Sequence, residues 1–327
     1  MSNLLEVKNL EVSFHTYAGE VKAVRGVSFE AKAGECLAIV GESGSGKTVT
    51  SKAVLGLIAT PPGEVKKTSE IIFDGQNIMN YSEKEWRAYR GKDAAMIFQD
   101  PMTSLNPTMK VGKQIMESIL LHSKVSKDEA KKRALELLKM VNIPNPEERM
   151  NQYPYEFSGG MRQRVVIAIA LACNPKLMIA DEPTTALDVT IQAQIIDLLK
   201  KIQKENNTAV VMITHDLGVV AGMADDIIVM YAGRIVEKGT VYEIFNEPKH
   251  PYTDALLKAV PNLKNENKSE LRIIPGTPPD LIAPPKGCGF ASRCQYCMGV
   301  CNEQSPEYTS FSGSHEAACW LNHPMAK

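Results

Sequence analysis

A glycine-rich segment of eight residues constrains the fold of this chain more than any other feature, and it reads Gly41-Glu42-Ser43-Gly44-Ser45-Gly46-Lys47-Thr48. It fits G-x-x-x-x-G-K-S/T, a loop in which backbone N–H groups surround phosphate oxygens, the lysine neutralises charge and the final hydroxyl reaches Mg²⁺. Glycine suits such a loop because the backbone must approach phosphate closely, often at positive φ. Residues 35–40 predict a buried strand before the loop, and residues 49–57, starting at Val49, predict a helix whose positive N-terminus faces the phosphates. The alternative is a simple glycine turn between a strand and a helix.

Two adjacent carboxylates, Asp181 and Glu182, follow the apolar run at residues 177–180. A buried strand of this kind would present Asp181 at the carboxyl edge of a sheet, where it can hold Mg²⁺ directly or through water. Glu182 would point in another direction and can polarise a water molecule for attack on a γ-phosphate. The alternative is an exposed Asp-Glu pair that begins a turn before Pro183.

A Ser-Gly-Gly segment, made of Ser158, Gly159 and Gly160, precedes an apolar helix. Ser158 is a suitable N-cap, so helix capping alone is one interpretation. The same N-terminus is also an anion site, and one nucleotide does not need two such loops far apart in sequence. We therefore expect this second loop to bind a group other than the nucleotide held by residues 41–48.

The remaining pattern predicts an α/β protein with a main domain and a smaller appendage, because 327 residues exceed what one hydrophobic core usually organises. Apolar and polar residues alternate over residues 4–34, which predicts an antiparallel pair of strands. Residues 105–175 are mostly helical in pattern. Strand-like runs at residues 177–180, 209–213 and 227–230 then alternate with helical stretches, which is typical of a covered parallel sheet.

Charge and hydropathy exclude several classes of protein. The net charge of −1 argues against a general nucleic-acid binder with a basic face. The longest purely apolar run, Val165–Cys173, has nine residues and is too short for a membrane span. The N-terminus lacks the pattern of a secretory signal, so we expect a cytoplasmic chain that sits on membrane partners.

In their order along the chain (residues 41–48, 158–160 and 181–182), these three segments resemble those of the ATP-binding subunit of an ATP-binding-cassette (ABC) transporter. In that family Ser-Gly-Gly is the signature loop, which completes the ATP site of a facing cassette across a dimer interface. The resemblance implies an ABC-type P-loop nucleotide-binding domain over residues 1–260, with a mixed sheet, an antiparallel β subdomain and a helical subdomain at about residues 100–175. It also implies ATP hydrolysis that depends on Mg²⁺.

The resemblance assigns roles to further residues. Gln99 matches the Q-loop glutamine, which is expected to contact Mg²⁺ and the attacking water, and His215 matches the switch histidine. Phe14 stands where the family places an aromatic ring against adenine, with Tyr17 as a weaker candidate and a core position for Phe14 as the alternative. The implied catalytic residues are Glu182, His215 and Gln99, and the implied Mg²⁺ ligands are Thr48, Gln99 and Asp181. The implied ATP contacts are Phe14, Gly41, Ser43, Gly44, Ser45, Gly46, Lys47, Thr48, Val49, Ser158, Gly159, Gly160 and the D-loop residue Asp188.

Seven cysteines are distributed unevenly. Cys36 and Cys173 lie in apolar segments and are expected in the core. The other five follow a Pro-rich stretch at residues 261–287, expected to be a linker or arm, and they are Cys288, Cys294, Cys297, Cys301 and Cys319. In a reducing cytosol such a cluster indicates a metal site rather than a set of disulfides.

Residues 288–327 resemble the cysteine-rich C-terminal extension of the oligopeptide and dipeptide importer ATPases, and residues 219–225 and 230–237 resemble their D-type subunit. Members of that extension can carry a 4Fe–4S cluster on four cysteines, which would correspond here to Cys288, Cys294, Cys301 and Cys319. Four thiolates also suit Zn²⁺, and unligated thiols that pack a small domain are a third interpretation. Cys297 is an alternative ligand, so the choice of ligands stays open.

The resemblance implies an ATPase subunit that energises import of dipeptides or oligopeptides at the cytoplasmic face of the membrane. Its implied partners are a second ABC ATPase subunit, expected to be a different F-type chain, two transmembrane permease subunits and, indirectly, an extracytoplasmic peptide-binding protein, with no nucleic acid. A soluble ABC ATPase of translation or DNA repair is the alternative, although such proteins tend to carry two cassettes or a long coiled coil. A third hypothesis, an electron carrier with an attached ATPase, is not excluded by the cysteines, but no flavin motif supports it.

Overall fold

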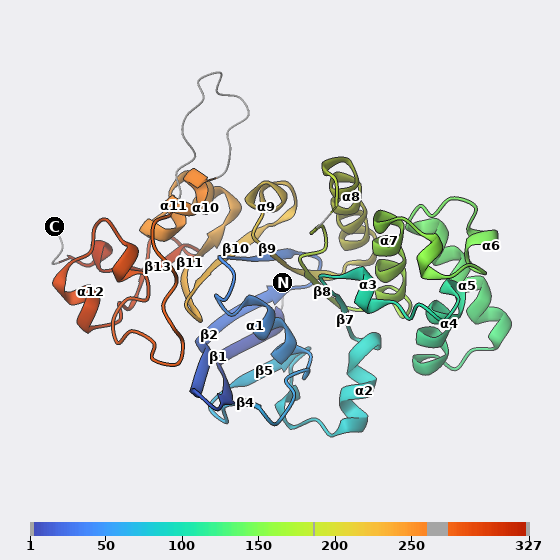
Figure 1. Ribbon diagram of the computed structural model, residues 1–327, viewed down its shortest axis with the longest axis horizontal. Helices are drawn as coiled ribbons and strands as arrows, with labels where there is room; N and C mark the ends of the chain where they lie inside the picture. The colour runs from blue at the N-terminus through green and yellow to red at the C-terminus, as the bar shows by residue number, and fades with distance from the viewer. Residues whose placement is uncertain (1–2, 186, 260–273, 325–327) are drawn as a thin grey trace, which may run out of the picture. The chain divides into compact units, whose positions relative to one another are not determined.

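The computed structural model describes residues 3–185, 187–259 and 274–324 (Figure 1). The chain divides into two compact units. Unit 1 takes the residues up to Leu4, Ala31–Cys36 and Asn80–Met212, and unit 2 takes Leu5–Glu30, Leu37–Met79 and the chain from Ile213 onward. Of the arm expected at residues 261–287, residues 261–273 lie outside the described ranges. No described helix combines the length and the apolar character needed to cross a membrane.

Unit 1 combines a short parallel sheet with the helices expected between residues 105 and 175. The strands β9, β8 and β7 are hydrogen-bonded neighbours in that order, and β7 and β8 run parallel. In chain order the elements are α2 (Glu83–Lys92), β7 (Ala94–Ile97), α3 (Pro101–Ser104), α4 (Val111–His122), α5 (Lys127–Met140), α6 (Pro146–Arg149), a 3-10 turn (Pro154–Glu156), α7 (Gly159–Ala170), β8 (Leu177–Asp181), α8 (Val189–Asn206) and β9 (Ala209–Thr214).

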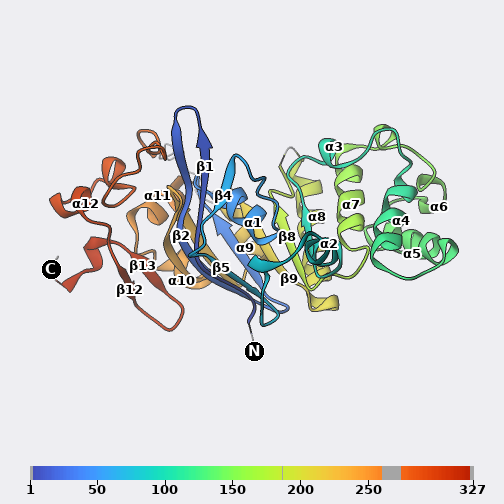
Figure 2. The same cartoon turned by 90° about the horizontal axis from the view of Figure 1, so that it is seen from below.

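The helices of unit 1 begin at capping residues and pack through apolar faces. Ser126 caps α5 by accepting a hydrogen bond from the N–H of Glu129, and the N–H of Ser126 donates one to the carboxylate of Glu129. The inner face of α5 includes Leu137 and Leu138, which are fully buried. In both views α5 lies beside α4 (Figures 1 and 2), and each fully buried leucine stabilises such packing by roughly 1.5–3 kcal/mol.

Unit 2 holds most of an antiparallel sheet and most of a second, mixed sheet. The antiparallel sheet has the order β2-β1-β5-β6, and β4 pairs with β1. In the mixed sheet β12, β13, β11, β10 and β3 are successive neighbours, and β10 runs parallel to β3. The elements are β1 (Asn3–Thr16), β2 (Gly19–Lys32), β3 (Cys36–Val40), α1 (Lys47–Val54), β4 (Gly63–Val65), β5 (Glu70–Phe73), β6 (Gln76–Asn77), a 3-10 turn (Ile78–Asn80), α9 (Leu217–Met223), β10 (Asp226–Tyr231), β11 (Arg234–Thr240), α10 (Val241–Asn246), α11 (Pro251–Ala259), 3-10 turns at Ala291–Arg293 and Trp320–Asn322, α12 (Gly299–Glu303), β12 (Tyr308–Ser310) and β13 (Glu316–Ala318).

The secondary structure confirms the expected α/β class, with an antiparallel β part and a helical part. The strand pair expected at residues 4–34 is β1 and β2. All five residues of β3 and of β8 are buried, as expected for strands covered on both faces. The helix after the glycine-rich loop differs from the prediction, because it runs from Lys47 to Val54 instead of residues 49–57. It ends early because Gly56 adopts a φ of 60°, a left-handed conformation that terminates helices.

The C-terminal extension is integrated into unit 2. Its strand β13 pairs antiparallel with β11, with Ala317 opposite Glu237. Phe290 is buried in a core that also contains Tyr231 and Tyr252. The cysteine-rich segment is therefore part of the same hydrophobic core as the mixed sheet of this unit.

Candidate nucleotide-binding site

The glycine-rich loop lies in unit 2 between β3 and α1, as the sequence predicts. Lys47 begins α1 and is only 6% exposed. Its Nζ donates hydrogen bonds to the carbonyl oxygens of Gly41 and Glu42, each at 2.8 Å, and contacts Oγ of Ser45 at 3.4 Å. The ammonium group is therefore held at the inner side of the loop, where it can meet a phosphate.

The loop requires glycine at position 46. In addition, no acidic side chain in the first turn of α1 would compete with a bound anion for the helix N-terminus. Gly46 has a φ of 101°, and a Cβ there would lie 2.6 Å from the carbonyl oxygen of Ala23. The first turn of α1 contains no acidic residue. Since a helix N-terminus attracts anions through its N–H groups and dipole, this end of α1 is suited to phosphate.

The other residues expected on this side of the site also lie in unit 2. Ser43 and Gly44 are exposed, whereas Thr48 and Val49 in the first turn of α1 are half-buried. Phe14 is half-buried on β1 opposite Gly63 of β4, which leaves part of its ring accessible. Tyr17, the weaker candidate for contact with adenine, is fully exposed.

Unit 1 brings Gln99 and Glu182 into contact. Nε2 of Gln99 donates a hydrogen bond of 2.7 Å to Oε2 of Glu182, and Oγ1 of Thr185 donates one of 2.9 Å to the same oxygen. Gln99 follows β7 and Glu182 follows β8, and because these strands are parallel, their carboxyl ends lie at one edge of the sheet. The sequence did not indicate the role of Thr185.

Asp181 and Glu182 occupy different environments although they are adjacent. Asp181 is the last residue of β8 and is 3% exposed. Glu182 is half-buried and has a φ of 48°, a left-handed conformation that is rare for glutamate. Such backbone outliers concentrate at functional sites, where the surrounding structure holds them in place. The two adjacent carboxylates therefore belong to residues of different burial and backbone conformation.

The Ser-Gly-Gly segment forms the N-terminus of α7. The side chain of Ser158 accepts a hydrogen bond of 3.4 Å from the N–H of Met161, so Ser158 does cap the helix. Ser158 and Gly159 are exposed. Gly160 packs against α8, where a Cβ would come within 2.7 Å of Cγ2 of Ile191. The capping role and a role as an exposed anion site are compatible, because the cap uses one N–H of the first turn.

Asp188 and His215 both stand at the beginning of helices. Asp188 caps α8 by accepting a hydrogen bond of 2.9 Å from the N–H of Ile191, and its D-loop neighbour Ala186 lies outside the described residues. His215 is exposed and lies in unit 2 between the end of β9 and Asp216, the N-cap of α9. The cap and the buried strand hold the backbone of His215 on both sides.

Four cysteines of the extension influence one another through space. Burial, together with the neighbouring thiols, raises the pKa of Cys288 to about 11 and that of Cys319 to about 12. The thiols that act on Cys319 are those of Cys288, Cys294 and Cys301. Cys297 is exposed, whereas Cys301 is buried. The thiol of Cys297 also contributes to the raised pKa of Cys288 and of Cys294, so all five cysteines of the extension belong to one group of neighbouring thiols.

The spacing of these thiols bears on which metal they fit. Zinc bound by four thiolates at about 2.3 Å requires sulfur atoms about 4 Å apart. In the described ranges, the one group of three or more ligand atoms within 4.8 Å of one another is His15, Glu20 and Glu64, so no three thiols are that close. Lys66 forms ion pairs with both carboxylates of that group, at 3.0 and 2.7 Å. Both a zinc site and a larger cluster held by Cys₄ stay open for these thiols.

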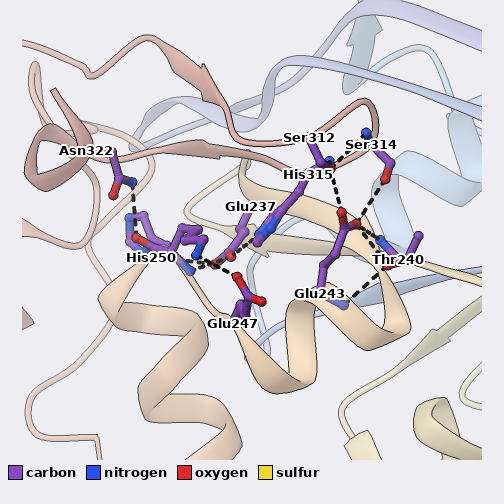
Figure 3. A network of polar contacts seen from close by, with 10 residues as sticks. Glu237, Thr240, Glu243, Glu247, His250, Ser312, Ser314, His315 and Asn322 are labelled. Carbon is purple, nitrogen blue, oxygen red and sulfur yellow. Dashed lines mark hydrogen bonds and ion pairs between the residues drawn. The ribbon is translucent and has the colours of Figure 1, made fainter. Parts of the chain in front are cut away.

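A network of polar contacts attaches the extension to β11, α10 and the segment before α11 (Figure 3). The fully buried carboxylate of Glu237 accepts hydrogen bonds from the N–H of Lys249 at 2.6 Å and the N–H of His250 at 2.9 Å, and it pairs with Nε2 of His315 at 2.8 Å. Burial opposes ionisation of Glu243, but hydrogen bonds from Ser312, Thr240 and Ser314 outweigh it and lower its pKa to about 2. Ser312, Ser314 and His315 belong to the extension, so this network fixes the extension to the rest of unit 2.

The chain matches two protein-family models and several curated proteins. Residues 24–185 match the family model described as ABC transporter, and residues 236–301 match the oligopeptide/dipeptide transporter C-terminal region. An oligopeptide transport ATP-binding protein of Bacillus subtilis (OppD) is 61% identical over 326 residues, covering 100% of this chain and 91% of that protein. A dipeptide transport ATP-binding protein of the same species (DppD) is 55% identical over 328 residues, covering 100% of this chain and 97% of that protein. OppD of Salmonella typhimurium is 52% identical over 317 residues, covering 97% and 93%.

Solved structures agree with the family match. The ATP-binding cassette MJ0796, solved as a dimer in a post-hydrolysis state with ADP and phosphate, has a TM-score of 0.65 at 29% identity and covers 72% of this chain and 98% of that chain. A second dimeric structure of MJ0796, described as a bacterial ABC transporter cassette, has the same TM-score at 30% identity, with coverage of 72% and 98%.

Proposed function

The chain belongs to the ATP-binding subunits of the ABC transporter family, and we propose that it is the ATP-hydrolysing subunit that energises import of dipeptides or oligopeptides through a membrane transporter. The observation that carries this proposal is the full-length similarity to peptide transport ATP-binding proteins, at 61% and 55% identity, which includes the C-terminal region. The soluble alternative in translation or DNA repair is not favoured, because the most similar relatives are named for transport.

The residues of unit 2 supply phosphate binding in this proposal. Lys47, the exposed N–H groups of the loop and the N-terminus of α1 bind the β- and γ-phosphates of ATP. Thr48 provides a hydroxyl for Mg²⁺, Phe14 stacks against adenine, and His215 acts on the γ-phosphate side. When bound, Mg²⁺ neutralises charge on the phosphate oxygens.

The residues of unit 1 supply the attack on the γ-phosphate. Glu182 polarises the attacking water, and Gln99 and Thr185 hold its carboxylate through hydrogen bonds of 2.7 and 2.9 Å to Oε2. Asp181 holds Mg²⁺, directly or through water. Catalysis of this kind consists mainly of positioning and of cations and N–H donors directed at developing negative charge.

The assembly proposed is a pair of cassettes on two membrane subunits. Ser158, Gly159 and Gly160 complete the ATP site of a facing cassette, a different F-type chain, and Asp188 lies at the same interface. The exposed N-terminus of α7 and the dimeric state in which MJ0796 was solved support this arrangement. The subunit would sit at the cytoplasmic face of the membrane, with a peptide-binding protein acting on the other side.

The cysteine-rich extension is proposed to hold a 4Fe–4S cluster on Cys288, Cys294, Cys301 and Cys319. Their mutual proximity supports a shared metal site, and Zn²⁺ is the alternative to the cluster. The cluster would supply a cross-link between four points of the extension. The cysteine thiols would lose their protons when the cluster binds, because a bound metal overcomes the raised pKa of the buried thiols.

Transport in a reconstituted system tests the proposed function. The chain is co-expressed with the permease subunits that co-purify with it, placed in vesicles with ATP on its own side, and assayed for uptake of labelled di- to pentapeptides. We expect ATP-dependent uptake that the variant Lys47→Ala abolishes. Copurification with ribosomes or DNA-repair proteins, without permeases and without uptake, would instead support the soluble alternative.

A further inference from the structure

Arg293 of the extension forms a bidentate ion pair with Glu42 of the phosphate loop. Its Nη1 donates to Oε2 of Glu42 at 2.6 Å, and its Nη2 donates to Oε1 of the same residue at 3.0 Å. The Arg293 side chain is 4% exposed, and that of Glu42 is 26% exposed. A paired guanidinium and carboxylate in this geometry is a strong, directional interaction that a lysine could not reproduce.

The surroundings of Arg293 hold its guanidinium in one orientation. Nη1 also donates to the hydroxyl of Tyr231 at 3.0 Å, while Nε donates to the carbonyl of Pro275 at 2.8 Å. The guanidinium lies 5.7 Å from the ring centroid of Tyr231 and 5.8 Å from that of Phe290. Arg293 ends a 3-10 turn between Cys288 and Cys294, so the cysteine-rich segment fixes the position of its backbone.

Glu42 is the second residue of the phosphate loop, and each of its polar groups has a partner. Its carbonyl accepts from Lys47 Nζ at 2.8 Å, and its N–H donates to the hydroxyl of Tyr252 at 2.9 Å. A carboxylate in a loop that binds a polyanion works against binding unless a cation compensates it. In this structure, that cation is Arg293.

Building on the proposed binding of ATP at this loop, we propose that Arg293 is a positioning residue for ATP binding, which neutralises Glu42 and holds the second residue of the phosphate loop in place. The extension is then a working part of the nucleotide site and not an independent appendage. A purely structural ion pair would instead stabilise the fold and leave nucleotide affinity unchanged.

The experiment measures ATP affinity in a charge-rescue series on the full-length chain. The variants are Arg293→Met, Arg293→Lys, Glu42→Gln and the double variant with Arg293→Met and Glu42→Gln, and the probe is Mg²⁺ with a β,γ-imido analogue of ATP in titration calorimetry. We expect Kd to rise about tenfold in Arg293→Met, the order expected for one uncompensated charge near a polyanion at an effective dielectric constant of about 20. Arg293→Lys should raise Kd by less. The Kd of the double variant should return to within about threefold of the wild-type value, because no charge is left uncompensated.

Two results would overturn the inference. One is a folded Arg293→Met protein with the Kd of the wild type, and the other is a double variant that binds as weakly as Arg293→Met. Arg234→Met is the matched control, because Arg234 lies exposed at the start of β11 in the same unit, and its Kd should not change. Should Arg293→Met fail to fold, the double variant decides, and a Kd raised about tenfold or more over the wild type in that variant then counts against the inference.

The same titrations separate this inference from the proposed function. A wild-type chain that binds no nucleotide, or a Lys47→Ala variant that binds as well as the wild type, would remove the proposed function itself. Wild-type binding that depends on Lys47 but not on Arg293 would remove only the role of Arg293.

Discussion

The side-chain amide of Gln99 donates a hydrogen bond of 2.7 Å to the carboxylate of Glu182, across 83 positions of sequence. The contact is possible because β7 and β8 are parallel and end at the same edge of their sheet. This hydrogen bond orients the Glu182 carboxylate through its Oε2 atom, to which Oγ1 of Thr185 also donates a hydrogen bond. In the proposed role of Glu182 as the general base, these hydrogen bonds would hold its carboxylate in position for the attacking water.

Replacing Glu182 with glutamine should separate binding from hydrolysis. Glu182→Gln keeps the size of the side chain but removes the base, so ATP hydrolysis should fall by a factor on the order of a hundred or more while ATP binding is retained. A phosphate-release assay and calorimetry on the same samples measure the two quantities. Glu205→Gln, on the exposed face of α8, is the control. Hydrolysis at the wild-type rate in Glu182→Gln would refute its assignment as the base.

Replacing Lys47 with alanine should weaken nucleotide binding itself. The ammonium group has no substitute in the loop, and a hydrogen bond to a charged phosphate contributes about 1.5–3 kcal/mol, or roughly tenfold to hundredfold in Kd. Calorimetry with ATP measures the change. Lys201→Ala on α8 serves as a control, since Lys201 is largely exposed and pairs loosely with Glu205 at 3.9 Å. Unchanged affinity in Lys47→Ala would count against the phosphate-binding role of the loop.

Unit 2 should lose stability in mild acid because of His250. Burial lowers the pKa of this histidine to about 3, whereas an exposed histidine has a pKa of about 6.5. The unfolded chain therefore binds a proton that the folded chain excludes, so the stability that depends on neutral His250 is complete above about pH 6.5 and is lost as the pH falls towards 3. Calorimetric unfolding from pH 7 to pH 4 measures this dependence.

A matched pair of variants tests the origin of that pH dependence. His250→Asn retains an acceptor for the N–H of Tyr252, which lies 3.0 Å from Nδ1, but does not titrate, so the pH dependence should flatten. His323→Asn changes an exposed histidine and should behave like the wild type. Equal slopes in wild type and His250→Asn would assign the acid sensitivity to groups of unit 2 other than His250.

Metal analysis of the purified chain should identify what the four cysteines hold. Anaerobic purification should yield a brown protein that contains about four iron and four sulfide per chain, as a Cys₄-bound cluster requires. Cys294→Ser should lower the iron content and the visible absorbance, whereas Cys173→Ser, in unit 1, should leave both unchanged. A colourless sample with zinc would favour the alternative, and a metal-free sample would mean that these thiols only pack the extension.

Much of the fold and of the candidate site follows from local sequence patterns. Residues 35–48 specify a buried strand, a glycine loop and a helix N-terminus, because the requirements of burial, backbone freedom and anion binding act on neighbouring residues. The apolar run before Asp181 places that carboxylate at the end of β8 for the same reason. The boundaries of α1 were less accurate, since Lys47 already joins the helix and Gly56 ends it.

The tertiary structure alone decided which distant side chains meet. An acidic Glu42 inside a phosphate loop indicates that some cation compensates it, but only the folded chain places Arg293, 251 positions later, at its carboxylate. The attachment of the extension through β13 and through Glu237 and His315 is equally invisible in sequence. The physical reason is that strand, turn and helix preferences act over a few residues, whereas these contacts depend on how the strands of unit 2 pair and pack.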